Sequence, residues 1–461
     1  MKEELKLSGV IWMIGISAII LFISSSLRHE LFQSTAYDLG IFDQAVYLIS
    51  QGKAPISSFM GFHILGDHAA WIWYPLALLY KIYPSVDWLF AVQAIALALG
   101  ALPTCYLGRQ AGLKDSQSLA MAAVYLLYPL VFNVNLFDFH PEVIAIPGLL
   151  AAVLAARSGK VWWFCASILL VLGCKAVLSL TVAAMGLWLL VFEKRRLCGA
   201  IAIFAGIVWF AIATQLIIPF FSGAEAAAVG RYSYLGNSVL DIAKNLLTRP
   251  GIILSKVFSL DNLGYLILLV APVIWGLSPQ NMQPLIGAIP CVALNILADY
   301  NAQKDLVHQY SVPALPFLIL AVISSLAQGR GWLQNKRGII LWSLVAFLSL
   351  AKFTHFGGIY LESVDNWQAT KQAISQVSTQ GNVYTTAQIA PHLSERELIQ
   401  FTNTDSPPAD FNNFEYVLLN VRHPGWASNR EFAISLVNKL QANSRFKLQY
   451  QRDDVYLFIK K

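Results

Sequence analysis

Charged residues are scarce in this sequence, and their scarcity excludes an ordinary soluble protein. Asp, Glu, Lys and Arg make up 13% of the 461 residues, against about 25% in a typical soluble domain. The apolar runs also lack the two-residue alternation that a membrane β-barrel requires. Many are roughly 20 residues long, enough to cross a hydrocarbon core as helices. The sequence therefore predicts an α-helical polytopic membrane protein.

Cysteine is also rare, and no two cysteines have the spacing of a metal site or a redox motif. The five cysteines fall in or beside apolar runs, at Cys105, Cys165, Cys174, Cys198 and Cys291, which is typical of small packing residues. The net charge of +6 comes with basic residues placed in short loops between apolar runs. Nucleic acid is therefore not an expected partner.

The gaps between the apolar runs alternate in composition, and this alternation predicts a topology. With the N-terminus inside, the short inner loops hold Arg109, Arg157, residues 193–196 and Arg330, as the positive-inside rule requires. The chain is then a multi-pass plasma-membrane protein with a cytoplasmic N-terminus. The eleven expected spans are residues 7–27, 87–107, 117–134, 142–156, 161–174, 176–192, 198–219, 263–277, 282–298, 312–328 and 338–356.

Two domains are expected. The transmembrane domain covers residues 1–358, and its first outer loop, 28–86, holds interfacial helices near 37–50 and 71–83. From residue 359, charged and amide residues become common and apolar runs shorten to strand length. We expect a soluble α/β domain at 359–461 on the outer side. Its expected elements are helices at 362–378 and 428–441, strands near 382–386, 397–402 and 416–421, and a hairpin at 446–459 that turns at 452–454.

Acidic residues and histidines gather where the outer loops meet the membrane, a depth at which ionisable groups are costly and usually functional. The candidate site residues there are Asp38, Asp43, Asp67, His68, Asp138, His140, Glu142, Lys175, His308 and Tyr310. We expect Asp38, Asp67, His68, His140 and Glu142 to converge on one outward-open cavity. Lys175 lies between the fifth and sixth spans, where two shorter helices could meet at a polar break.

Several of these residues also have a structural interpretation, which the sequence leaves open. Asp38 precedes an interfacial helix and could cap its N-terminus. Asp43 could be solvated on the polar face of that helix. Glu142 suits the first turn of a helix, where a carboxylate meets the helix dipole. His308 and Tyr310 could belong to an interfacial belt.

Two further features point toward phosphate or metal chemistry. Asp138, His140 and Glu142 alternate along the chain, as in a loop that orients a metal or a phosphate. Lys175 lies in apolar surroundings, where it needs an anionic partner or water. A lipid phosphate would serve as that partner.

Four motifs together resemble a known family. Residues 37–44 read Tyr-Asp-Leu-Gly-Ile-Phe-Asp-Gln, and they are followed by Gly66-Asp67-His68, Phe139-His140-Pro141-Glu142, and a run His-Gln-Tyr-Ser-x-Pro at 308–313. In these motifs the sequence is similar to a family of bacterial multi-spanning membrane proteins without an assigned reaction. That family is grouped by fold with the GT-C glycosyltransferases. The resemblance covers most of the chain, including its C-terminal part.

The GT-C resemblance implies a site. In that superfamily, which includes protein O-mannosyltransferases and lipid A aminoarabinose transferases, an acidic residue near the end of the first span assists the acceptor. The donor is a sugar on a polyprenyl phosphate. By position, Asp38 matches the acid. The resemblance also implies acidic residues after Lys175, where this sequence has Ala176 and Val177.

The resemblance thus implies a membrane glycosyltransferase that acts on the outer face of the bacterial plasma membrane. Asp38 would orient the acceptor hydroxyl or take its proton. Lys175, with one of His68, His140 or His308, would balance the charge of the departing polyprenyl phosphate.

Other roles remain open. A divalent metal, Mg or Mn, on Asp38, Asp43 or Asp138 could balance the phosphate charge instead. A lipid or polysaccharide transporter or flippase would suit the helix break at Lys175. A non-catalytic membrane sensor or assembly protein would suit the absence of acids after Lys175.

Overall fold

The computed structural model describes residues 2–461, with side chains from residue 8 onward. The chain forms two compact units. The first holds the residues up to Ile23, residues 65–72 and residues 90–352, and the second holds residues 24–64, 73–89 and 353–461. Much of the segment 28–86 therefore clusters with the C-terminal residues. The domain boundary expected at residue 359 stays a prediction.

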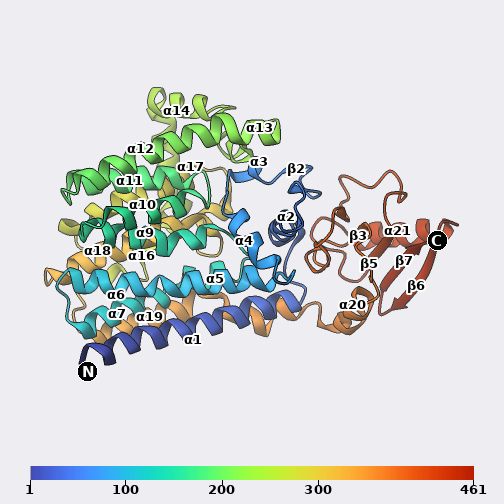
Figure 1. Cartoon of the computed structure of the whole chain (residues 1–461), viewed down its shortest axis with the longest axis horizontal. Helices are drawn as coiled ribbons and strands as arrows, with labels where there is room; N and C mark the ends of the chain where they lie inside the picture. Colours follow the sequence, from blue (N-terminus) through green and yellow to red (C-terminus); the bar gives the residue numbers. More distant parts are fainter. Residues whose placement is uncertain (1) are drawn as a thin grey trace. The chain divides into compact units, whose positions relative to one another are not determined.

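Helices form the first unit (Figure 1). Helix α1 begins in this unit and ends in the second, whereas α5 begins in the second unit and ends in this one. The bounds are α1 Lys2–Glu30, α3 Leu65–His68, α5 Asp87–Leu99, α6 Ala101–Gln110, α7 Asp115–Leu126, α8 Pro129–Asn135, α9 Glu142–Arg157, α10 Val161–Leu172, α11 Leu178–Val191, α12 Arg196–Ile212, α13 Ile218–Ser222, α14 Val239–Thr248, α15 Pro250–Val257, α16 Leu260–Val270, α17 Ile289–Leu297, α18 Leu315–Ala327 and α19 Lys336–Leu350.

Small residues allow α11 and α12 to pack closely. A Cβ atom at Gly199 would lie 2.8 Å from the backbone oxygen of Gly186, and one at Gly206 would lie 2.5 Å from the backbone oxygen of Ser179. Close backbone approach at small residues is a common way for helices to associate in membranes, where apolar burial alone gives little driving force. These glycines therefore fix the spacing of the two helices.

Several helices are long and apolar enough to cross a membrane. Within residues 2–461 there are four by length and composition, or up to seven if each bent pair of helices counts as one span. The four are Ser8–Glu30, Asp87–Gln110, Arg196–Ser222 and Gln309–Ala327. Shorter apolar helices occupy further expected spans, among them α10 and α11. The number of eleven spans and their orientation stay predictions.

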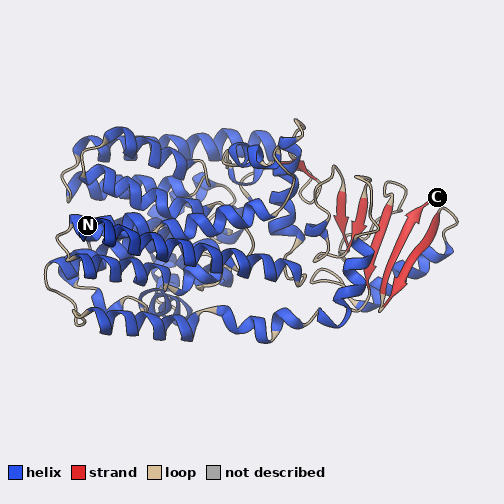
Figure 2. Cartoon of the chain, turned by 60° about the horizontal axis from the view of Figure 1, so that its bottom comes forward, coloured by secondary structure: helices blue, strands red, loops and turns tan. Residues whose placement is uncertain are grey.

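The second unit combines short helices with a sheet (Figure 2). A π-helical turn, η1, precedes α2, so the expected helix at 37–50 begins with an irregular turn. The bounds are η1 Ala36–Gly40, α2 Ile41–Ser50, β1 Ile56–Ser57, β2 Phe62–His63, α4 Trp73–Tyr80, α20 Trp367–Ile374, β3 Val383–Thr385, β4 Ile399–Phe401, β5 Tyr416–Asn420, α21 Arg430–Ala442, β6 Phe446–Arg452 and β7 Val455–Lys460.

Five strands form a mixed sheet in the order β4-β3-β5-β7-β6. Strand β3 runs parallel to β4 and β5, whereas β7 runs antiparallel to β5 and β6. Successive residues of β5 pack into different hydrophobic cores. Leu418 packs with α20, and Val417 packs with α21. The two helices therefore cover opposite faces of the sheet.

The expected elements of the C-terminal part lie close to their predicted positions. The hairpin turns at Asp453 and Asp454, whose φ angles are 48° and 63°, as a tight two-residue hairpin loop requires. The expected helix at 362–378 is shorter, because 3₁₀ turns occupy residues 359–361 and 364–366 before α20 begins.

Candidate functional site

The polar break between α10 and α11 positions Lys175. The backbone N–H of Ala176 donates to the carbonyl of His68 (2.9 Å), and the N–H of Ile72 donates to the carbonyl of Gly173 (3.0 Å). The short segment 65–72 therefore lies along the break. This pairing brings His68 and Lys175, far apart in sequence, to the same place.

Lys175 pairs with a carboxylate from the start of α9. Its Nζ lies 2.5 Å from Oε1 of Glu142, and the two side chains are 11% and 4% exposed. The second oxygen, Oε2, is buried and has no hydrogen-bond partner among residues 8–461. A buried ion pair of this kind leaves one acceptor oxygen for a further donor.

His68 faces the same pair. Burial, and then the positive charge of Lys175, lower the pKa of His68 to about 3, so its imidazole is neutral at pH 7. Its Nε2 lies 3.3 Å from Oδ2 of Asp67. The charges of Glu142 and His140 also act on His68, which places these candidates within electrostatic reach of one another.

An aromatic side chain connects two of the histidines. Phe137 stacks on His140, with ring centroids 5.3 Å apart, and meets His308 edge to face at 4.2 Å. Asp305 lies 2.7 Å from Nδ1 of His308 and orients its ring. Although burial opposes ionisation, hydrogen bonds from His308 lower the pKa of Asp305, so this carboxylate stays charged.

Asp138 turns the chain next to these rings. It is 2% exposed, and its φ of 76° is in the left-handed region, which Asp tolerates better than most residues. The loop before α9 is therefore sharply turned.

A second cation, which the sequence motifs did not indicate, lies beside Tyr310. The guanidinium of Arg231 lies 4.9 Å from the ring centroid of Tyr310 and 4.6 Å from that of Tyr300, and it donates to the Tyr310 hydroxyl (3.1 Å). The Nζ of Lys175 lies 6.0 Å from the same Tyr310 ring. Two cations therefore lie near the Tyr310 ring, and Arg231 is recognised only from the contacts in the structure.

Asp38 and Asp43 belong to the second unit, and their structural alternatives need correction. No side-chain capping bond forms at the N-terminus of η1 or α2, where the cap positions are Thr35 and Gly40, so Asp38 is not the helix cap. Asp43 is not solvated, because it is 1% exposed and accepts hydrogen bonds from Tyr80 (2.5 Å) and Ser394 (2.7 Å). The convergence of Asp38 with the first-unit residues stays a prediction.

Between residues 8 and 461, no three His, Cys, Asp or Glu side chains gather in a way that could hold a metal ion. Among these residues, no preformed cluster of ligands therefore supports a metal ion on Asp38, Asp43 or Asp138.

Comparison with known proteins identifies the family. Residues 28–457 match the family described as "Predicted membrane protein (DUF2079)". The chain belongs to this family. The match includes the motifs at residues 37–44, 66–68, 139–142 and 308–313, so the resemblance based on them is confirmed. No functionally curated protein matches the sequence.

Several solved structures are similar to this DUF2079 member. ArnT from Cupriavidus metallidurans, solved with undecaprenyl phosphate, is 12% identical, with a TM-score of 0.54 and 97% of each chain covered. The same protein in the apo state has 11% identity, a TM-score of 0.47 and the same coverage. Oligosaccharyltransferase AglB from Archaeoglobus fulgidus has 10% identity and a TM-score of 0.43, covering 100% of this chain and 74% of its own. The first match supports the GT-C grouping at the level of fold.

Proposed function

We propose that this protein is a GT-C glycosyltransferase that uses a polyprenyl-phosphate-linked sugar on the outer face of the bacterial plasma membrane. The observation that carries the proposal is the buried Lys175–Glu142 pair at a helix break. ArnT, which has a similar fold, was solved with undecaprenyl phosphate. A buried cation beside a polar break suits the phosphate of such a lipid, because a phosphate can share Lys175 with Glu142.

The proposed reaction is a displacement at the anomeric carbon of the donor sugar. The acceptor oxygen forms a bond to this carbon, the bond to the phosphate oxygen breaks, and polyprenyl phosphate leaves with the electron pair. Asp38 takes the proton of the acceptor hydroxyl or orients it. If Asp38 has no such role, Asp43 or Glu142 is the next candidate base.

The cations around Tyr310 would stabilise the departing phosphate. Lys175 and Arg231 both lie close to that ring, and two cations can compensate the charge that develops on a leaving phosphate. His68 is neutral at pH 7 and would act as a hydrogen-bonding group, not as a charge. His140 and His308, held by Phe137, are the other candidates for this role.

Binding of the carrier lipid provides the first test. Purified protein in lipid nanodiscs is titrated with undecaprenyl phosphate, and bound lipid is measured by native mass spectrometry. We expect Lys175→Met to weaken binding at least tenfold, because a charge-assisted hydrogen bond is worth roughly 1.5–3 kcal/mol. Lys256→Met is the matched control, since Lys256 forms an exposed pair with Asp299. Equal binding by both variants would contradict a phosphate site at Lys175.

Turnover provides the second test. Membranes containing the protein are supplied with candidate lipid-linked sugars, and release of polyprenyl phosphate is followed. Asp38→Asn should lower the rate by roughly 10²–10⁴-fold with unchanged melting, because Asn preserves the size of the side chain. Asp241→Asn, at an exposed carboxylate near the N-terminus of α14, should be active. Full activity of Asp38→Asn would make Asp38 structural.

The interruption between α10 and α11 also supports a second candidate function, a lipid flippase, because broken helices occur at transport sites. A reconstituted protein that moves a lipid-linked sugar across a vesicle membrane without releasing polyprenyl phosphate would favour this function.

A further inference from the structure

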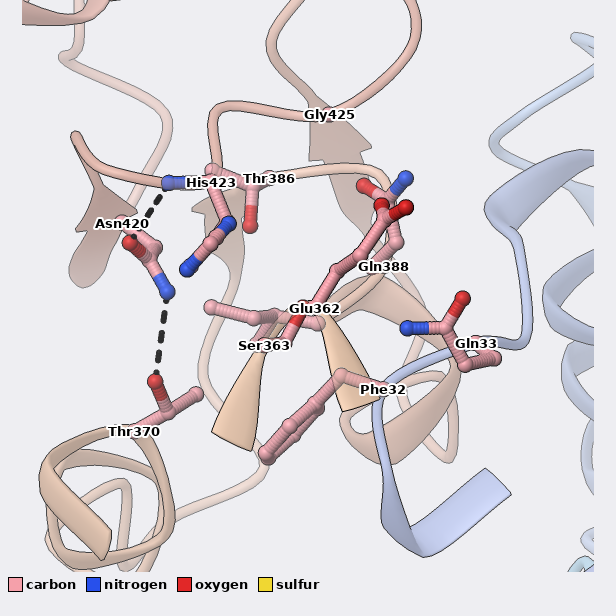
Figure 3. Close-up of a pocket in the computed structure, with 11 residues that line it drawn as sticks. Phe32, Gln33, Glu362, Ser363, Thr370, Thr386, Gln388, Asn420, His423 and Gly425 are labelled. Atoms are coloured by element: carbon pink, nitrogen blue, oxygen red, sulfur yellow. Dashed lines mark hydrogen bonds between the residues drawn. The ribbon is translucent and has the colours of Figure 1, made fainter. Parts of the chain in front are cut away.

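A small polar pocket lies within the second unit, and none of the residues that line it has a role in the proposed reaction. Its volume is about 210 Å³. Phe32 and Gln33 line it from the chain after α1, and the other lining residues come from the segment around α20 and from the loops after β3 and β5 (Figure 3).

The sheet topology explains why a pocket forms here. Strands β3 and β5 are parallel neighbours, so their carboxyl ends, near Thr386 and Asn420, lie at the same edge of the sheet. The chain leaving β3 packs into the core on the α20 face, whereas the chain leaving β5 continues into α21 on the other face. When neighbouring connections diverge to opposite faces, a crevice opens between the strand ends, and α/β proteins bind their ligands there.

An unpartnered hydroxyl points into this pocket. Thr386 is 0% exposed, and its Oγ1 has no hydrogen-bond partner in the part of the chain with described side chains. Figure 3 shows this oxygen directed toward the space between Ser363 and His423. The side-chain oxygen of Gln388, which also lines the pocket, has no partner there either. Buried polar groups of this kind usually have a partner, and a ligand hydroxyl would supply one.

The rest of the pocket is held in place by its own contacts. The amide of Asn420 accepts from the backbone N–H of His423 (3.0 Å) and donates to the hydroxyl of Thr370 (3.3 Å) (Figure 3). Gly425 is required, because its φ is 92° and a Cβ there would lie 2.6 Å from the side-chain oxygen of Gln388. The polar groups are therefore positioned before any ligand arrives, which lowers the entropic cost of binding.

The lining chemistry selects the ligand. Three amides, three hydroxyls and the carboxylate of Glu362 offer both donors and acceptors, and the Phe32 ring offers an apolar face. None of the lining residues is Lys or Arg, and the ring of His423 is already paired with the carboxylate of Asp365 (2.7 Å), so the lining favours a neutral ligand over an anion. The volume is below the roughly 300–1,000 Å³ of sites for drug-sized ligands. We propose that this pocket binds one neutral sugar ring, either free or at the end of a glycan or glycolipid.

Two threonine substitutions test the proposal. Thr386→Val keeps the shape of the side chain and removes the hydroxyl that points into the pocket. Thr385→Val is the matched control, because the Thr385 hydroxyl is also buried and unpartnered among the described residues but does not line the pocket. Each change removes an unsatisfied polar group, so both variants should melt at or above the wild-type temperature.

Binding is measured on the full chain in phospholipid nanodiscs, because maltoside detergents would compete. Saturation-transfer NMR uses glucose, galactose, mannose, N-acetylglucosamine and their methyl glycosides, with glucuronate and inorganic phosphate as anionic probes. We expect at least one neutral sugar to bind, roughly three- to tenfold more weakly in Thr386→Val and equally in Thr385→Val. Binding of methyl glycosides would indicate a chain-linked sugar, and binding of reducing sugars alone a free one.

Three outcomes would overturn the proposal: no neutral sugar binds, the anionic probes bind better, or Thr386→Val binds as tightly as Thr385→Val. The measurement involves no turnover, so it does not depend on the proposed transferase activity. Either proposal can therefore fail without the other.

Discussion

Replacing Lys175 should destabilise the protein strongly, and replacing its partner as well should restore much of the stability. Lys175 and Glu142 are 11% and 4% exposed, so each is largely removed from solvent. Lys175→Met leaves the Glu142 carboxylate buried without its cation. Removing one partner of a buried ion pair costs about 3–5 kcal/mol, which for a chain of this size corresponds to roughly 5–10 °C in melting temperature.

The double variant Glu142→Met with Lys175→Met removes both charges and keeps unbranched side chains of similar length. Replacing a buried pair with apolar residues is often neutral or stabilising. We therefore expect its melting temperature to approach that of the wild type. If Lys175 also binds the lipid phosphate, this stable variant should still fail to bind undecaprenyl phosphate, which separates folding from function.

The assay is thermal unfolding in one detergent, followed by intrinsic fluorescence for the wild type, both single variants and the double variant. Lys371→Met is the control, because the Lys371–Glu30 pair is nearly half exposed and such pairs contribute little. A Lys175→Met variant as stable as the control, or a double variant no more stable than the singles, would refute the reasoning.

Three further predictions concern topology, pH and packing. Cysteine labelling in intact cells should reach a cysteine at residue 439, which is exposed on α21, and not one at residue 195, which is also exposed. The reverse pattern would contradict the positive-inside orientation. Burial raises the pKa of Asp43, and hydrogen bonds from Ser394 and Tyr80 partly oppose this rise. The carboxyl therefore contributes stability that is complete below pH ~4 and is lost as pH rises, so the melting temperature should fall over that range. Asp43→Asn should make this fall smaller. Gly199→Ala should lower the melting temperature by several degrees, because the added Cβ would meet the backbone of α11. Gly15→Ala should leave the melting temperature unchanged, because a Cβ there would have nothing within 4 Å. Equal melting temperatures of the two variants would contradict the close packing of α11 and α12.

Local sequence was sufficient for the elements whose shape depends on neighbouring residues. The break at Lys175 could be predicted because one charged residue interrupts an apolar run, and the chain is non-helical between Leu172 and Leu178. The hairpin turn was found in the same way, because Asp453 and Asp454 tolerate positive φ between two alternating strands.

Residues that act through distant partners could not be predicted. Asp43 has the spacing of a solvated residue on its helix, but Tyr80 and Ser394 enclose it. Arg231 appears in the sequence as one basic residue of a loop, and only the fold places it beside both Tyr300 and Tyr310. No pattern within a short window contains these pairings.

By itself, the sequence determined that this is a multi-pass membrane protein of its family, because apolar length, charge and motifs are properties of consecutive residues. The tertiary structure decided which charges compensate one another. The carboxylate beside Lys175 is not in the positions after it, held by Ala176 and Val177, but is Glu142 on another helix. A buried charge is stable only with a partner at contact distance, and contact distance is set by how helices pack, not by their order in the chain.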